Sequence, residues 1–150
     1  MSFASEAIFQ PGFDGLAVYC SDGRFARQCE QFLHDGLGLS GCDCLVVPGG
    51  PGALVGHAEA AIEHTGLLAD LRSLVEGHGL ERLVLIAHEG CAFYAGRLGL
   101  EPQAIPAAQR ADLDRAARLI RQATPGVRLE AYLAHCDEDE TVQFERLALT

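Results

Sequence analysis

The stretch Leu83-Val84-Leu85-Ile86-Ala87, followed directly by His88-Glu89-Gly90-Cys91, decides the fold class of this 150-residue chain. An unbroken apolar run of this length predicts a strand buried on both faces, and such strands belong to parallel sheets covered by helices. In these sheets, functional side chains lie just beyond the carboxyl ends of the strands. His88 and Cys91 are therefore candidates for a functional site.

Similar apolar runs recur on both sides of this stretch, and segments with helical spacing separate them. The predicted strands are 16–20, 44–47, 83–87, 127–135 and, at an edge, 142–147. The predicted helices are 24–36, 58–75, 91–98 and 112–122, with a rigid, exposed turn at 48–52 and a linker at 102–106. This alternation predicts one α/β domain over residues 1–150, with a mostly parallel central sheet flanked by helices.

The composition narrows the classes of partner. The formal net charge is −10, and such a chain is repelled by nucleic acid and by anionic membrane surfaces. We also find no apolar run long enough to cross a bilayer and no signal-like start, and we therefore expect a cytoplasmic protein. In that compartment, metal-binding or catalytic roles are favoured over disulfides for some of the six cysteines.

Three residues form a candidate zinc site. Cys91 follows His88 by three positions at a helix start, and Cys20 ends a strand that could lie beside the strand carrying His88. Zinc favours thiolate and imidazole ligands, and a catalytic zinc site has three protein ligands with a fourth position for water. The sequence therefore predicts zinc held by Cys20, His88 and Cys91.

Two charged residues follow the first of these ligands. Asp22 and Arg24 lie at alternate positions after Cys20, so the three share a face if the extended backbone persists. Asp22 could accept a hydrogen bond from a zinc-generated hydroxide, while Arg24 keeps Asp22 ionised and oriented. Asp22 could instead bind the zinc directly and close the site.

The pattern Cys-x-Asp-x-Arg, followed downstream by His-x-x-Cys, resembles the signature of the β-class carbonic anhydrases, and the chain resembles a compact, divergent member of that family. The resemblance implies zinc on Cys20, His88 and Cys91, with Asp22 and Arg24 as a catalytic dyad. It implies reversible hydration of carbon dioxide to bicarbonate by a zinc-hydroxide mechanism, and a homodimer or an assembly built from dimers. Related proteins on this scaffold hydrolyse carbon disulfide or carbonyl sulfide.

The chain departs from the family pattern at two places. Ala92 stands where the family usually has Gly after the second zinc cysteine, and Pro48-Gly49-Gly50 replaces a common Arg-Asn-Ala-Gly segment. Two other functions therefore stay open. One is a zinc-binding protein without turnover, with Asp22 as a fixed fourth ligand.

The other is a thiol hydrolase. The segment from Leu45 to Ala53 resembles the strand and turn of the DJ-1/PfpI superfamily, in which the strand corresponding to 83–87 delivers a nucleophilic cysteine. In this chain His88 takes that place, and the reading leaves Cys20, Asp22 and Arg24 without a role.

The remaining candidate residues are assigned structural roles. Cys29 is predicted to be core, and Cys136 to fill a strand end. Cys42 and Cys44 flank a strand start, where a second metal site lacks a nearby partner pair. Glu89 is either a proton carrier beside the zinc ligands or a surface residue. We expect the remaining histidines outside the strands to be solvated (His34, His57, His64 and His78), and likewise the acidic turn at 137–140.

Overall fold

The computed structural model describes residues 1–57 and 65–150, so residues 58–64 of one predicted helix, including His64, lie outside the described residues. The elements in chain order are β1 (Gly15–Cys20), α1 (Ala26–Gln31), the π-helical turn η1 (Phe32–Gly36), β2 (Cys42–Val47), the 3-10 helix η2 (Gly50–Leu54), α2 (Thr65–His78), β3 (Arg82–His88), η4 (Phe93–Arg97), η5 (Pro102–Ala104), α3 (Ile105–Ala123), β4 (Arg128–Cys136) and β5 (Val142–Leu147).

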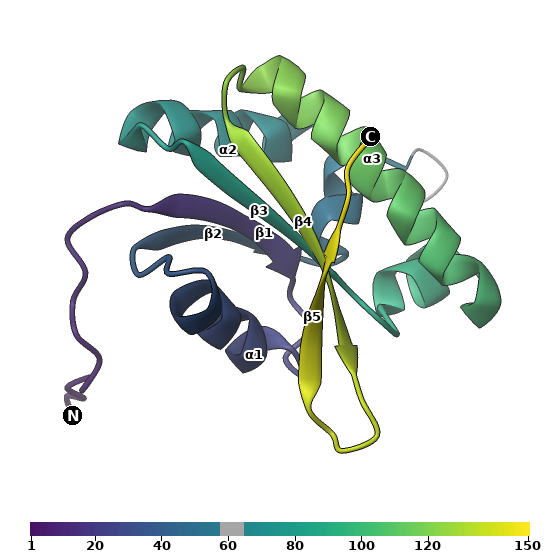
Figure 1. Cartoon of the computed structure of the whole chain (residues 1–150), viewed down its shortest axis with the longest axis horizontal. Helices are drawn as coiled ribbons and strands as arrows, with labels where there is room; N and C mark the ends of the chain where they lie inside the picture. The colour runs from purple at the N-terminus through teal and green to yellow at the C-terminus, as the bar shows by residue number, and fades with distance from the viewer. Residues whose placement is uncertain (58–64) are drawn as a thin grey trace.

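The five strands form one sheet in the order β2-β1-β3-β4-β5. The first three pairings are parallel, and only β5 runs antiparallel to its neighbour β4. Helices α2 and α3 cover one face of the sheet, and α1 covers the other (Figure 1). The predicted fold class, a mostly parallel sheet flanked by helices, is confirmed.

The core consists of two apolar layers, one on each face of the sheet. Alternate residues of β1 point to opposite faces, so Leu16 and Val18 pack with α2 and α3 while Ala17 and Tyr19 pack with α1. β3 divides in the same way, and its residues from Leu83 to His88 are all buried. Burial on both faces explains why the sequence of this strand shows no alternation of polar and apolar residues.

Two predictions about connecting segments are wrong. Residues 102–106 are not a linker, because η5 leads directly into α3, which begins at Ile105 with Pro106 in its first turn. Proline is tolerated there, since the first N–H groups of a helix have no partner within the helix. The turn at 48–52 is exposed only at Pro48, because Gly49 to Gly52 are buried against β1 and η4.

A buried ion pair joins β3 to β4 at the end of the sheet where these strands begin. Arg82 donates from Nε to Glu130 Oε1 at 2.7 Å and from Nη2 to Glu130 Oε2 at 3.2 Å, and the Tyr132 hydroxyl donates to the same carboxylate at 2.9 Å. The hydrogen bonds from Arg82 lower the pKa of Glu130 below its ordinary value. Bidentate pairs of this kind are among the stronger hydrogen bonds in proteins.

We expect Glu130→Gln to lower the free energy of unfolding by about 2 kcal/mol at pH 7, because charge-assisted hydrogen bonds are lost. A carboxyl whose pKa is lowered by folding stabilises above its unfolded pKa and loses this effect as the pH falls through its folded pKa. The deficit should therefore shrink below about pH 4. Urea unfolding at pH 7 and at pH 3 to 4 measures this.

The matched control is Glu76→Gln, which removes a carboxylate whose pair with Arg72 is exposed on both sides. Such exposed pairs contribute little, so this variant should unfold within about 0.5 kcal/mol of the unchanged chain. Equal costs at the two sites, or a Glu130→Gln deficit that does not change with pH, would contradict the assignment.

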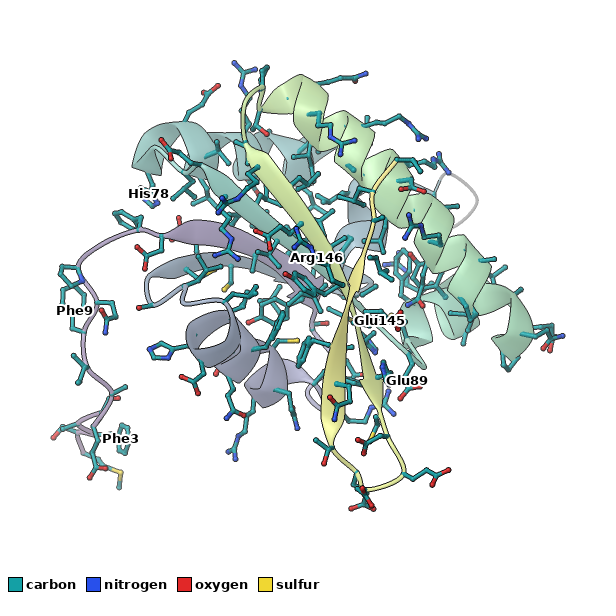
Figure 2. All side chains as sticks on the ribbon, viewed as in Figure 1. Phe3, Phe9, His78, Glu89, Glu145 and Arg146 are labelled. Carbon is teal, nitrogen blue, oxygen red and sulfur yellow. The ribbon has the colours of Figure 1, made fainter. Side chains whose placement is uncertain are left out.

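Two surface features lie apart from the sheet ends where the predicted ligands are found. The segment before β1 extends away from the body of the molecule, and Phe3 and Phe9 are exposed along it (Figure 2).

Among the described residues, none of the helices has the length and apolar character needed to traverse a bilayer.

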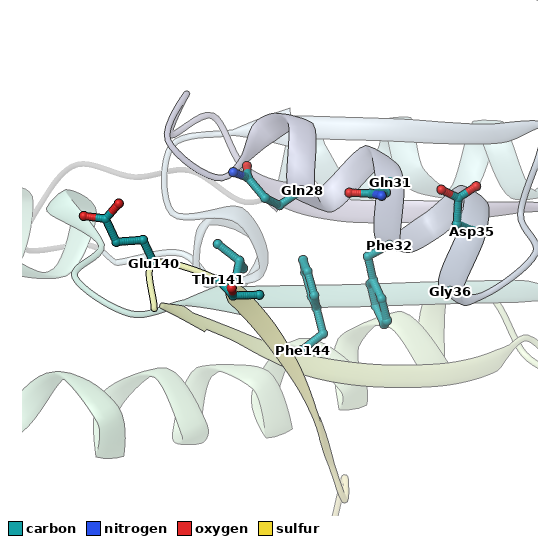
Figure 3. Close-up of a pocket in the computed structure, with 9 residues that line it drawn as sticks. Gln28, Gln31, Phe32, Asp35, Gly36, Glu140, Thr141 and Phe144 are labelled. Carbon is teal, nitrogen blue, oxygen red and sulfur yellow. The ribbon is translucent and has the colours of Figure 1, made fainter. Parts of the chain in front are cut away.

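An open groove lies between α1 and β5 (Figure 3). It has a volume of about 520 Å³, and the stacked rings of Phe32 and Phe144, with centroids 4.1 Å apart, line it. None of the three predicted zinc ligands lines this groove, so it lies outside the candidate site.

Candidate metal centre

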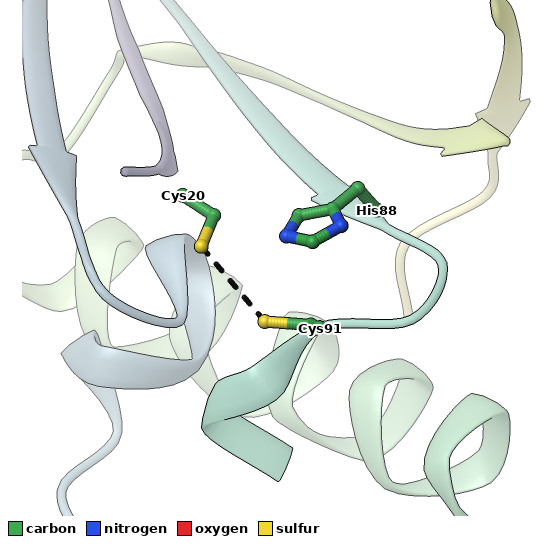
Figure 4. Close-up of side chains that lie close together, drawn as sticks. All are labelled: Cys20, His88 and Cys91. Carbon is green, nitrogen blue, oxygen red and sulfur yellow. Dashed lines mark hydrogen bonds between the residues drawn. The ribbon is translucent and has the colours of Figure 1, made fainter. Parts of the chain in front are cut away.

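Cys20, His88 and Cys91 converge at one end of the sheet. One potential ligand atom from each lies within 4.8 Å of the others, and the two sulfurs are 3.9 Å apart (Figure 4). Their exposed fractions are 9%, 3% and 1%, respectively. No other group of three or more His, Cys, Asp or Glu residues with this spacing occurs in the described parts of the chain.

The topology of the sheet explains why residues far apart in sequence meet here. From β1 the chain crosses to β2 on one side and then returns to β3 on the other, so β1 and β3 are neighbours at the point where the strand order reverses. Their parallel register pairs Tyr19 with Ile86, which places the carboxyl ends of both strands together. This is the position at which open α/β sheets usually form their sites.

His88 is oriented to bind a metal ion through its Nε2 atom. Its Nδ1 lies 2.7 Å from the carbonyl oxygen of Glu89, and its backbone carbonyl accepts a hydrogen bond from Gln109. The ring of Phe25 packs against the imidazole at 4.6 Å between centroids. The buried Nε2 atom has no hydrogen-bond partner among the described residues. A buried polar atom without a partner is rare, and in a metalloprotein it is typically a ligand atom.

A short turn places Cys91 opposite His88. Gly90 adopts a positive φ of 62°, and the carbonyl of Cys91 then accepts hydrogen bonds from the N–H groups of Tyr94 and Ala95. Ala92 has a helical backbone with φ of −62°, and its side chain is exposed. Alanine in place of the family's usual glycine therefore creates no conflict in this turn.

The Pro48-Gly49-Gly50 segment contacts the site directly. The Gly49 N–H donates to Cys20 Sγ at 3.4 Å, and Gly49 has a positive φ of 85°. The pKa of the Cys20 thiol is lowered, chiefly by its hydrogen bond with the Cys91 thiol, and the Gly49 N–H contributes as well. The same hydrogen bond raises the pKa of the Cys91 thiol. The arrangement thus favours a thiolate at Cys20.

Asp22 and Arg24 form a tight pair at the mouth of this cluster. The guanidinium donates from Nη2 to Asp22 Oδ2 at 2.6 Å and from Nε to Oδ1 at 3.0 Å, and it also reaches the Gly90 carbonyl at 3.3 Å. These bonds hold the pKa of Asp22 at about 2. Asp22 Oδ2 lies 3.9 Å from His88 Nε2. The strand ends at Cys20, as predicted, so a turn and not a continued extended backbone brings the pair to the site.

Gly50 is a position where no side chain fits. Its φ is +51°, and an added Cβ would lie 2.8 Å from the backbone nitrogen of Cys20 and 2.9 Å from the carbonyl carbon of Tyr19. We expect Gly50→Ala to lower the free energy of unfolding by about 2 kcal/mol or more, because the strained backbone adds to the clash. Thermal unfolding followed by circular dichroism measures the loss.

Gly77→Ala is the matched control, since an added Cβ there meets nothing within 4 Å in helix α2. Alanine is the better helix former, so this variant should be at least as stable as the unchanged chain. If the two variants unfold at the same temperature, the close approach of Gly50 to β1 carries no cost and the argument is wrong.

The other cysteines lie outside the cluster. Cys29 is buried in the core on the inner side of α1, as predicted. Cys42 and Cys44 lie on β2, an outer strand of the sheet, and Cys136 is exposed at the end of β4. Glu89 is exposed, and its carboxylate accepts a hydrogen bond from the backbone N–H of Cys136.

One histidine prediction is wrong. His57 is not solvated: its side chain is only 11% exposed, and its Nε2 lies 3.0 Å from a carboxylate oxygen of the buried Asp112. His78 is exposed, as predicted, and it stacks on Phe13 and lies within hydrogen-bond distance of Asp43. His34 is exposed, as is the turn at 137–140 apart from the half-buried Asp137, in line with the sequence. The local sequence around His57 shows no sign of its partner, which lies far along the chain on α3.

The donor set of the cluster suits a soft or borderline divalent metal ion. Two sulfurs and one imidazole nitrogen are the ligands found in zinc sites, and three protein ligands leave a position for water or substrate. A buried thiolate and a paired carboxylate beside it are the kinds of group that functional sites contain.

Comparison with known proteins agrees with this architecture. The model of the family described as "Putative carbonic anhydrase" matches residues 12–144. No curated protein matches the chain. Among solved structures, β-carbonic anhydrase isoform I of the protozoan Trichomonas vaginalis is 14% identical with a TM-score of 0.58, over 93% of this chain and 87% of that one.

Two further structures resemble the chain to a similar degree. The wild-type β-carbonic anhydrase CafD of the filamentous fungus Aspergillus fumigatus is 16% identical with a TM-score of 0.52, over 97% of this chain and 95% of that one. The carbonic anhydrase of Streptococcus mutans is 15% identical with a TM-score of 0.52, over 92% of this chain and 87% of that one. The fold is that of these enzymes, and the family model covers most of the sequence. The chain therefore belongs to the family described as "Putative carbonic anhydrase", and it has the fold of the β-carbonic anhydrases.

Proposed function

We propose that this chain is a zinc-dependent carbonic anhydrase that hydrates carbon dioxide reversibly to bicarbonate, with Cys20, His88 and Cys91 as the zinc ligands. The observation that carries the proposal is the buried Nε2 of His88, which has no hydrogen-bond partner among the described residues, in a cluster where one ring nitrogen and both thiol sulfurs lie within 4.8 Å of one another. An apolar core offers no reason to hold such an atom without a partner, whereas a zinc ion would occupy its lone pair. The residues present therefore fit the metal that the family implies.

A zinc ion held by these ligands would supply a Lewis acid that lowers the pKa of a bound water and so provides a nucleophile at neutral pH. The protein contributes the surroundings. Asp22, kept ionised and oriented by Arg24, can accept a hydrogen bond at the cluster and direct the reacting lone pair toward the substrate carbon. Phe25 against His88 and the buried Gly49 to Gly52 segment exclude bulk water.

The burial of the three candidate ligands favours a small substrate. Carbon dioxide is the substrate we propose, and carbon disulfide and carbonyl sulfide have a similar linear shape and an electrophilic carbon. Neither departure from the family pattern argues against turnover, because Ala92 faces solvent and Gly49 donates to a ligand sulfur.

Two observations weigh against the alternative functions. As a nucleophile, Cys91 would need an accessible thiolate, yet it is buried and its pKa is raised. A fixed fourth ligand at Asp22 would require its carboxylate to leave the three hydrogen bonds that Arg24 provides through its side chain. The predicted homodimer and the cytoplasmic location stay predictions, and sedimentation analysis would check the first.

The test combines metal analysis with a hydration assay. Purified protein should contain about one zinc per chain, and stopped-flow measurements should show hydration of carbon dioxide that disappears after chelation and returns with added zinc. Parallel assays with carbonyl sulfide and carbon disulfide would assign the substrate. Zinc without any of these activities would overturn the enzymatic function, and a well-folded chain that binds no metal would overturn the ligand assignment.

A further inference from the structure

A buried carboxylate lies next to the candidate metal centre without belonging to it. Asp112, in the middle of α3, is buried, and its Oδ2 accepts a hydrogen bond from the Tyr94 hydroxyl at 2.8 Å. His57 Nε2 lies 3.0 Å from the same oxygen, whereas Arg115 is 3.9 Å from the other one. One atom thus joins two segments that come from different parts of the chain.

The first segment reaches from Asp112 to the sulfur of Cys20. It runs from Gly49 through η2 to His57, and the Gly52 N–H donates to the Gly49 carbonyl at 3.0 Å within it. At one end of the segment, the Gly49 N–H donates a hydrogen bond to Cys20 Sγ. At the other end, His57 lies within hydrogen-bond distance of Asp112. The carboxylate therefore anchors the loop that supplies a hydrogen bond to one predicted ligand.

The second segment reaches from Asp112 to Cys91. Tyr94 follows Cys91 by three residues, and its N–H donates to the Cys91 carbonyl at 3.1 Å. The Tyr94 side chain is buried in the same apolar cluster as both cysteines. The Tyr94 hydroxyl donates a hydrogen bond to Asp112. The same carboxylate therefore holds both the turn that carries Cys91 and the loop that contacts Cys20.

The loop is closely packed against this junction at two glycines. An added Cβ on Gly52 would lie 2.3 Å from the Tyr94 hydroxyl oxygen and 3.4 Å from Asp112 Oδ2. The Phe93 ring lies against the same loop, because an added Cβ on Gly49 would approach this ring to 2.6 Å. The His57 ring packs edge-on against Phe93, with 5.7 Å between the ring centroids. The glycines are what allow the hydroxyl, the carboxylate and the ring to approach the loop.

We propose that Asp112 is a positioning residue for the metal centre, which fixes the separation of Cys20 and Cys91 through His57 and Tyr94. The inference rests on the proposed function, because it assumes that a metal ion binds between the two sulfurs. The two sulfurs lie 3.9 Å apart, and an ion between them would require this separation to be kept when both lose their protons and repel each other. Groups that hold ligands in place in this way commonly change metal affinity by 10- to 100-fold when they are removed.

The test compares Asp112→Leu with Asp112→Asn and with Asp114→Asn. Leucine removes both hydrogen bonds at similar size, whereas asparagine keeps an oxygen that can accept them. Asp114 is on the same helix but is bonded to the Thr150 backbone N–H, away from the cluster. Zinc affinity is measured by competition with a chromogenic chelator, the ligand geometry by the absorption spectrum of the cobalt-substituted protein, and folding by thermal unfolding.

We expect Asp112→Leu to weaken zinc binding about 10- to 100-fold and to alter the cobalt spectrum. Asp112→Asn should restore both to near the unchanged values, and Asp114→Asn should leave both unchanged. A folded Asp112→Leu protein with unchanged affinity and spectrum would overturn the inference, because a role in stability alone moves neither readout.

Tyr94→Phe provides a second variant if Asp112→Leu does not fold, since it removes a single hydroxyl and keeps the ring. It should lower zinc affinity and alter the cobalt spectrum, and unchanged values would again overturn the inference. The unchanged chain, assayed beside the variants, separates the two proposals. Zinc bound without carbon dioxide hydration would defeat the proposed enzyme and leave Asp112 as a positioning residue, whereas no zinc bound would defeat both.

Discussion

Cys91→Ala is expected to abolish zinc binding, and with it all hydration of carbon dioxide. The variant removes one of two sulfurs in a cluster of three predicted ligands and leaves an imidazole and one thiolate, which cannot complete a three-ligand zinc site. Loss of a ligand should exceed the roughly 10- to 100-fold loss that follows removal of a group behind a ligand. Metal analysis after dialysis and a chelator competition assay measure it.

Cys29→Ala is the control for this substitution. Cys29 is also a buried cysteine, 3% exposed, but it lies on α1 among apolar neighbours, and its pKa is raised to about 12 by burial. Both variants lose one buried sulfur, so both lose similar packing, and only Cys91→Ala should lose the metal. Zinc retained in Cys91→Ala, or lost equally from both, would remove Cys91 from the ligand set.

Asp22→Asn is expected to lower the rate of carbon dioxide hydration by about 10²- to 10⁴-fold, the range typical for loss of a proton-accepting group at a reaction centre. The zinc content should not change, because Asp22 is not one of the three proposed ligands. The amide keeps the size of the carboxylate, but it has no charge and one of its two oxygens is replaced by an NH₂ donor. It can therefore no longer direct the nucleophile or accept hydrogen bonds from both Nε and Nη2 of Arg24. Stopped-flow hydration assays with parallel zinc analysis test both parts.

Asp35→Asn is the matched change on the surface, where an exposed carboxylate pairs with His34. It should hydrate carbon dioxide at the unchanged rate. Full activity in Asp22→Asn would remove this residue from the mechanism, and a loss of zinc would show that Asp22 is a ligand, as expected for a zinc-binding protein that does not turn over.

The sequence was sufficient to predict the strands and the convergence of the three candidate ligands. β1 and β3 are buried on both faces, so their unbroken apolar runs identify them without an alignment. Cys20 and His88 are the last residues of these strands, and the rule that parallel strands place their carboxyl ends at one edge then brings them together. The pairing of Asp22 with Arg24 was predictable because the two are close in sequence.

The buried support behind the site was not predictable. His57 and Asp112 are 55 residues apart, on segments whose contact depends on how the loop after β2 meets α3. A histidine beside glycine in a loop usually faces solvent, and nothing local to His57 indicates otherwise. Likewise, glycine and proline in 48–52 indicate a turn, but not that small residues there allow the backbone to approach β1 closely. Long-range packing decides both cases.

The burial of the three candidate ligands also has a kinetic consequence. With at most 9% of each residue exposed, a solvated ion cannot meet both sulfurs and the imidazole nitrogen until covering residues move aside. Uptake and release of the ion are therefore timed by transient local unfolding of the polypeptide around the site and not by diffusion in the surrounding solution. A cell that runs short of zinc would consequently empty the proposed zinc site slowly.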